Sequence, residues 1–81
     1  MKKYYEIKVT NYYVKNLTYR IEIDVQENTN IEEIIKKFAE RKSVEYVLLL
    51  YDKDEVCVAI DTLEYSYKEI SKEEYEKIKI K

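Results

Sequence analysis

The amino-acid sequence predicts one α+β domain over residues 1–81: an antiparallel sheet of about five strands in the order ββαβββα, with the main helix packed on one face. Two early stretches alternate apolar with polar residues, as strands do, and one later stretch repeats apolar residues with helical spacing. Of the 81 residues, 46% are hydrophobic, which is too many for a disordered tail and sufficient for one small core.

Two strands open the predicted fold. Apolar residues alternate with polar ones over residues 5–13 and again over residues 17–25, at odd positions in both runs. Opposed residues of an antiparallel pair share a face, so odd positions must pair with odd ones. A three-residue loop at 14–16 preserves this parity and places Asn16 in the left-handed conformation, which asparagine tolerates.

The main helix is predicted over residues 31–42. Glu32–Lys36 and Glu33–Lys37 form favourable pairs four residues apart. A capping box precedes the helix, formed either by Thr29 with Glu32 or by Asn30 with Glu33. The residues expected to pack on the sheet share one helical face: Ile31, Ile34, Ile35, Phe38 and Ala39.

Three further strands and a short helix complete the expected order. Residues 44–51 and 55–60 are apolar at consecutive positions, which indicates central strands joined by a polar turn. Residues 63–67 alternate and predict a fifth strand. A second capping box begins at Ser71 and predicts a short helix over 72–79; the alternative is a final strand, because Ile78 and Ile80 alternate with lysines.

The opening hairpin, the helix and the strand expected after it resemble the start of a β-grasp, the ubiquitin-like fold. Residues 17–44 carry this resemblance through their spacing. It implies a β-grasp-like alternative with a C-terminal strand. It implies no activity, because one fold hosts many functions.

The composition argues against catalysis and against bound metals or cofactors. The chain has no histidine, no glycine and one cysteine, so the usual zinc and haem ligand sets, nucleophile–histidine pairs and glycine-rich phosphate loops cannot be assembled. Cys57 lies in an apolar run and is expected to be a buried, inert thiol. We therefore expect a protein that is not an enzyme and needs no cofactor.

Charge and hydropathy indicate the cellular compartment and limit the classes of partner that the protein is expected to bind. A net charge of −2 gives no general attraction to nucleic acid or to anionic membranes. No apolar run is long enough to span a membrane, and no signal-peptide core follows Met1, so a cytoplasmic location in a host cell is expected. Abundant Lys, Glu, Ile and Tyr is typical of small viral and mobile-element proteins, and also of thermophiles.

Tyrosines and carboxylates are the candidate interface residues. Tyr4 and Tyr12 are expected on the face of the first strand opposite the core, where they could anchor a protein interface, cover the sheet or stack on bases. Acidic residues gather in two regions and could imitate a phosphate backbone, or could form an ordinary solvated surface. The candidates are Glu22 and Asp24 in one region, which also contains Glu27, Glu32 and Glu33, and Asp52, Asp54, Glu55, Asp61 and Glu64 in the other.

These observations predict a non-catalytic interaction protein, encoded by a virus or mobile element, that binds and occludes a host protein as anti-CRISPR or nuclease inhibitors do. The alternatives are a nucleic-acid-binding regulator and a structural or oligomerising protein. A homodimer is also expected, because residues 44–51 and 55–60, as strands, would expose a second apolar sheet face. The C-terminal helix could instead cover that face.

Overall fold

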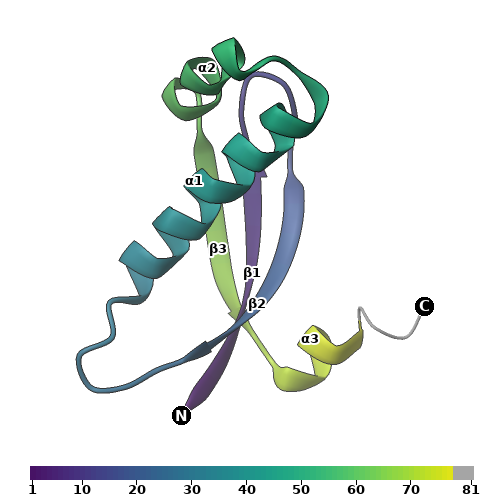
Figure 1. The fold of residues 1–81 in the computed structure, drawn as a ribbon. Coiled ribbons are helices and arrows are strands. Elements are labelled where there is room, and N and C mark those ends of the chain that lie inside the picture. The colour runs from purple at the N-terminus through teal and green to yellow at the C-terminus, as the bar shows by residue number, and fades with distance from the viewer. Residues whose placement is uncertain (78–81) are drawn as a thin grey trace.

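The computed structural model describes residues 1–77, which form one three-stranded antiparallel sheet and a set of helices (Figure 1). The strands are β1 (Lys2–Thr10), β2 (Leu17–Asp24) and β3 (Glu64–Ile70), in the antiparallel order β2-β1-β3. The helices are α1 (Ile31–Leu50), the 3-10 helix η1 (Lys53–Glu55), α2 (Val56–Asp61) and α3 (Lys72–Lys77). The α+β class is confirmed, whereas the five-stranded ββαβββα order is wrong.

The β1–β2 hairpin keeps the predicted parity but not the predicted loop. Tyr5 lies opposite Ile21 and Val9 opposite Leu17, so odd positions pair with odd ones. The loop is longer than three residues, because β1 ends at Thr10 and the Asn11 side chain turns the chain there. The Asn11 Oδ1 accepts hydrogen bonds from the Tyr13 and Val14 amides, at 2.7 and 3.1 Å. Asn16 has a φ of 58°, which confirms the left-handed conformation.

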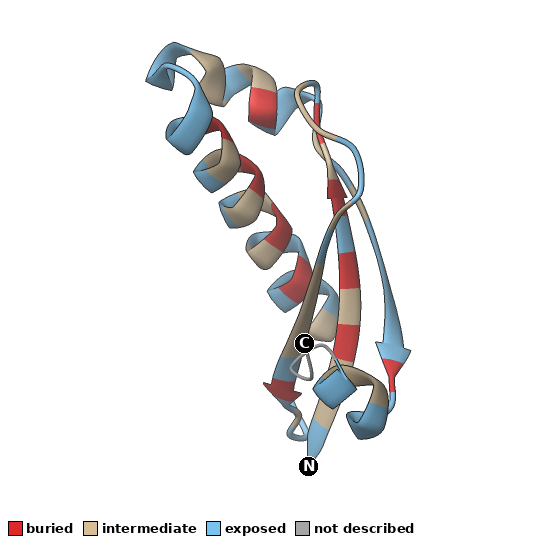
Figure 2. Ribbon diagram, turned by 90° about the vertical axis from the view of Figure 1, so that its right-hand side faces the viewer, coloured by how far each residue is buried: buried red, intermediate tan, exposed pale blue. Residues whose placement is uncertain are grey.

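Helix α1 crosses one face of the sheet obliquely and buries one row of side chains against it (Figures 1 and 2). The row is spaced by four residues, as a helix face requires, and consists of Ile35, Ala39, Ser43 and Val47. The first two join the core with Ile7 and Val9 of β1. Ile34, which was predicted to face the sheet, is 39% exposed and lies beside the contact.

The strands predicted over residues 44–51 and 55–60 do not exist. Helix α1 continues to Leu50, and residues 55–60 lie in η1 and α2. The helical row that begins at Ile35 continues through Ser43 to Val47, and no glycine or proline intervenes to end it. The β-grasp resemblance fails at the same point, because the strand expected at Val44 is helix.

The predicted helix starts are confirmed in part. The Asn30 Oδ1 accepts a hydrogen bond from the Glu33 amide at 3.1 Å, which selects Asn30 over Thr29 as the cap of α1. Ser71 caps α3 by accepting from the Glu74 amide at 3.0 Å. The strand predicted at 63–67 is β3, and the helix predicted from Lys72 is α3. The predictions for residues 78–81 lie outside the described residues.

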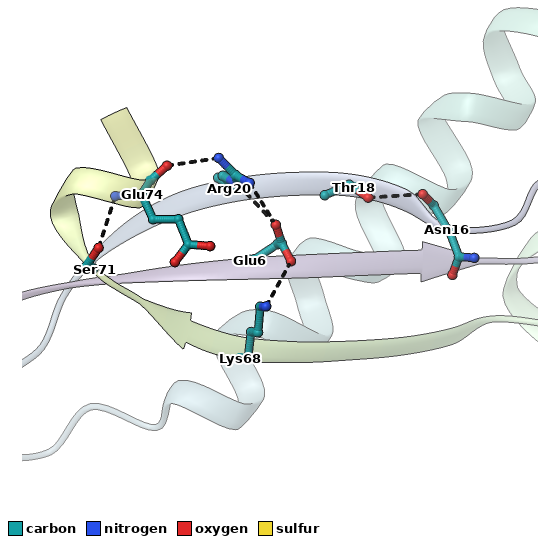
Figure 3. A network of polar contacts seen from close by, with 7 residues as sticks. All are labelled: Glu6, Asn16, Thr18, Arg20, Lys68, Ser71 and Glu74. Carbon is teal, nitrogen blue, oxygen red and sulfur yellow. Dashed lines mark hydrogen bonds and ion pairs between the residues drawn. The ribbon is translucent and has the colours of Figure 1, made fainter. Parts of the chain in front are cut away.

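The opposite face of the sheet is polar and only partly covered. Helix α3 packs on one end of it, where the Tyr75 ring lies 4.9 Å from the Tyr4 ring. Farther along, Glu6 accepts hydrogen bonds from Arg20 at 3.1 and 3.2 Å, and Lys68 lies 3.8 Å from its other carboxylate oxygen (Figure 3). Charged side chains from all three strands therefore pair on this face.

Substitution of the two neighbouring isoleucines of α1 tests which helix face packs on the sheet. Ile35→Ala should lower the free energy of unfolding by about 2–5 kcal/mol, because its side chain is fully buried. Ile34→Ala, the matched control, should cost less than about 1 kcal/mol. Urea denaturation measures both, and equal costs would contradict the packing.

The left-handed residue of the hairpin loop provides a second test. Asn16→Gly should leave the free energy of unfolding unchanged or raise it slightly, because glycine has no steric penalty at positive φ. Lys15→Gly, beside it, should lower the free energy of unfolding. Lys15 is not among the positive-φ residues, so glycine relieves no strain there and only increases the conformational entropy of the unfolded chain. Thermal unfolding of both variants would show whether the order of stabilities is as expected.

Candidate protein-binding surface

A buried polar network ties together the three segments at one end of the molecule. The Asn11 Nδ2 donates to the Ser43 Oγ at 2.8 Å, and the Ser43 hydroxyl donates to the Ala59 carbonyl at 3.1 Å. All three residues are buried. The network joins the β1–β2 loop to the middle of α1 and to α2, at the upper end of Figure 1. We call this end the apex.

Three tyrosines fix the loops at the apex against one another. The Tyr13 ring lies 5.1 Å from Tyr12 and 4.6 Å from Tyr51, and its hydroxyl donates to the Glu55 carboxylate at 2.8 Å. The Tyr12 amide donates to the Thr62 Oγ1 at 2.9 Å. Partial burial and the bond to Glu55 raise the pKa of Tyr13 to about 12. The phenol therefore stays protonated and keeps its bond throughout the physiological range.

Exposed apolar side chains gather at the same end. Nine large hydrophobic residues are exposed within residues 1–77, and six of them belong to the β1–β2 loop, the last turn of α1 and its cap, or α2. Leu49 is 83% exposed and Tyr12 74%. Figure 2 shows the exposed upper end of α1 and the loop that follows it. The six are Tyr12, Leu48, Leu49, Leu50, Tyr51 and Ile60.

The chain from the end of α1 to the start of β3 carries an excess of negative charge. Residues 44–64 contain six acidic residues and one lysine, a net charge of −5, whereas the whole chain carries −2. Five of these carboxylates follow α1 in the chain: Asp52, Asp54, Glu55, Asp61 and Glu64. Together with the six apolar residues they define what we call the apex surface.

The structure brings six of the nine sequence-predicted interface residues to the apex: Tyr12, Asp52, Asp54, Glu55, Asp61 and Glu64. The other three lie toward the opposite end, where each has a contact within the chain. Tyr4 is covered by Tyr75, Glu22 pairs with Lys2 at 2.9 Å, and Asp24 lies 3.4 Å from the N-terminal amine. Tyr4 and Tyr12 do not share a strand face, because β1 ends before Tyr12.

Sequence reasoning missed the leucines of this surface. An apolar run in a strand is buried on both sides, so Leu48, Leu49 and Leu50 were expected in a sheet. In a helix the same three residues point in different directions. In this last turn of α1 the preceding residue, Val47, is buried, whereas Leu48, Leu49 and Leu50 are exposed. The spacing of four from Ile35 to Val47 was the available signal.

A second apolar sheet face, on which the expected dimer depended, does not form without those strands.

The apex surface carries no group of metal ligands in the part of the chain that is described. No three His, Cys, Asp or Glu side chains within residues 1–77 are placed to hold a metal ion. Cys57 is exposed on α2, which corrects the expectation of a buried thiol in a strand. None of the helices described in residues 1–77 is both long and apolar enough to cross a membrane.

Comparisons with protein-family models, with curated proteins and with solved structures return no match for this chain. Its function is therefore inferred from its own geometry.

Removal of the central hydroxyl tests the apex network. Ser43→Ala should lower the free energy of unfolding by about 1–3 kcal/mol, because it leaves the Asn11 amide without its buried acceptor and the Ala59 carbonyl without its donor. Ser66→Ala, on an exposed position of β3, is the matched control and should change stability by less than about 0.5 kcal/mol. A Ser43→Ala protein as stable as the wild type would contradict the network.

The Tyr13–Glu55 contact predicts a pH dependence. The folded pKa of about 12 lies above the ordinary value of 10.0, so the folded state holds this proton more tightly than the unfolded state. The resulting stabilisation is present below pH 10 and is lost as the pH rises through 12. Ultraviolet titration should show a late tyrosinate step that Tyr13→Phe removes and Tyr12→Phe, the control, retains.

Proposed function

We propose that this chain is a non-catalytic binding protein that docks on a partner protein through its apex surface. The observation that carries the proposal is the gathering of six exposed apolar side chains at one end of a small chain. Large exposed apolar patches bordered by polar residues mark protein interaction sites. Two of the six are tyrosines, a residue enriched where interfaces contribute most binding energy.

The charge of the apex indicates the kind of partner. A surface with a net charge of −5 over residues 44–64 is complementary to a basic one and speeds association with it. Basic surfaces are typical of proteins that bind nucleic acid. The proposal is therefore that a basic, apolar-centred site on a host protein is occluded, as a virus-encoded or mobile-element-encoded inhibitor of a nuclease or CRISPR effector would do.

The internal contacts of the apex support its use as a preformed surface. The Asn11–Ser43–Ala59 network and the contact between the Tyr13 and Tyr51 rings hold the loops that carry the exposed residues. Ordering loops on binding reduces affinity, so a surface already ordered retains more of its contact energy. Leu49 and Tyr12, the most exposed of the six, do not support the core and are free to contact a partner.

A random peptide library displayed on phage tests the proposal whatever the identity of the host protein. Selection on the immobilised protein should enrich peptides that combine lysine or arginine with large apolar residues. Leu49→Ser should weaken the binding of those peptides about tenfold, equivalent to about 1.4 kcal/mol. Fluorescence anisotropy measures the dissociation constants of wild type and variant.

Ile34→Ser is the matched control, because it removes a second exposed aliphatic side chain from the same helix. It should leave peptide affinity unchanged. Enriched peptides that lack basic residues, or that bind wild type and Leu49→Ser equally, would contradict the proposal. A gel shift at low salt with single-stranded and duplex oligonucleotides should show no complex; a shift would favour the nucleic-acid-binding alternative.

A further inference from the structure

The outer edge of β2 is a long strand edge with no partner among residues 1–77, where β2 pairs with β1 alone. The pairing is continuous over its eight residues, without bulge or proline, so two of the features that usually prevent strand addition are absent; the charged side chains of this edge strand are Arg20, Glu22 and Asp24. The other edge strand, β3, also pairs with β1 alone among residues 1–77, but α1 crosses over its face and the Tyr67 hydroxyl donates to Glu32 of α1 at 2.8 Å.

The helix-facing side chains of β2 are less well covered than those of β1. On β1, Tyr5, Ile7 and Val9 are buried, whereas their partners Ile21, Tyr19 and Leu17 on β2 are only half-buried. Figure 1 shows the reason, because α1 begins on the β3 side of the sheet and crosses toward β2 only near its C-terminal end. A further strand beside β2 would cover this apolar row.

The sequence of β2 is complementary to itself in one antiparallel register. A twofold axis at Ile21 places Arg20 opposite Glu22 of a second copy, twice by symmetry, and Tyr19 opposite Ile23. A twofold axis at Arg20 or at Glu22 would instead place that residue opposite the same residue of the second copy, with like charges facing each other. An axis at Ile23 would place Glu22 opposite Asp24. Arg20 is held by Glu6 of β1 and by the Glu74 carbonyl at 2.9 Å, so its guanidinium lies on the sheet face opposite α1 (Figure 3).

We propose that two copies of this chain associate through their β2 edges, in the register centred on Ile21, to form one continuous six-stranded antiparallel sheet. The contact is made by strand edges and requires no apolar sheet face. The two β2 strands run in opposite directions, and β2 begins at the apex, so the two apex surfaces lie at opposite ends of the dimer. Each dimer therefore presents two binding surfaces pointing away from each other.

Sedimentation velocity over a concentration series tests the proposal. Wild-type protein should pass from monomer to dimer between low and high micromolar concentration. Glu22→Lys should raise the dimer dissociation constant about tenfold or more, because it replaces two attractive pairs with Arg20 by two repulsive ones. Glu22 is on the surface and forms an ion pair with Lys2, which does not belong to the core, so circular dichroism should show an unchanged fold.

Glu69→Lys is the matched control: it makes the same charge change in a surface lysine pair, Lys3–Glu69, on the other edge strand. It should leave the dimer constant unchanged, as should Leu49→Ser at the apex. Amide hydrogen exchange of the wild type should slow in β2 as concentration rises. A strictly monomeric mass at high micromolar protein, or a dimer weakened by Leu49→Ser and not by Glu22→Lys, would overturn the proposal.

Discussion

The organisation of this protein depends on one buried hydroxyl, that of Ser43. A polar group in an apolar interior costs several kcal/mol unless it is hydrogen-bonded. Ser43 satisfies this requirement in both directions, since it accepts from Asn11 and donates to the Ala59 carbonyl. The same asparagine accepts from two amides of its own turn. The end of β1, the continuation of α1 and the position of α2 are therefore set by a single connected group of polar atoms.

That constraint explains why apolar residues reach the surface. With Ser43 and Val47 directed inward, the last turn of α1 must direct Leu48, Leu49 and Leu50 elsewhere, because successive helical residues point about 100° apart. The described chain contains nothing else near this turn to cover all three, and α2 is only six residues long. The exposed leucines follow from the geometry of a helix anchored on its opposite side, and they are the strongest indication of a partner.

The apex segment, residues 44–64, differs in charge from the remainder of the chain. The apex segment has an excess of carboxylates, whereas the remainder of the chain is net positive, since the total charge is only −2. On the sheet face opposite α1, Glu6 lies between Arg20 and Lys68, so charges are paired there instead of accumulating. Attraction of a basic partner would consequently act at the apex and not on the paired face.

The sequence by itself determined the α+β class, the parity of the first hairpin, the left-handed Asn16, the start of α1 at Asn30 and the acidic character of residues 52–64. Each depends on local spacing or on one residue's backbone preference. For residues 44–50 the spacing of four from Ile35 to Val47 was a local signal of helix, but only the tertiary structure decided the state of residues 55–60, because that apolar run has no period that separates strand from helix. The choice was made by contacts distant in sequence, Asn11 with Ser43 and Ser43 with Ala59, which no local pattern records.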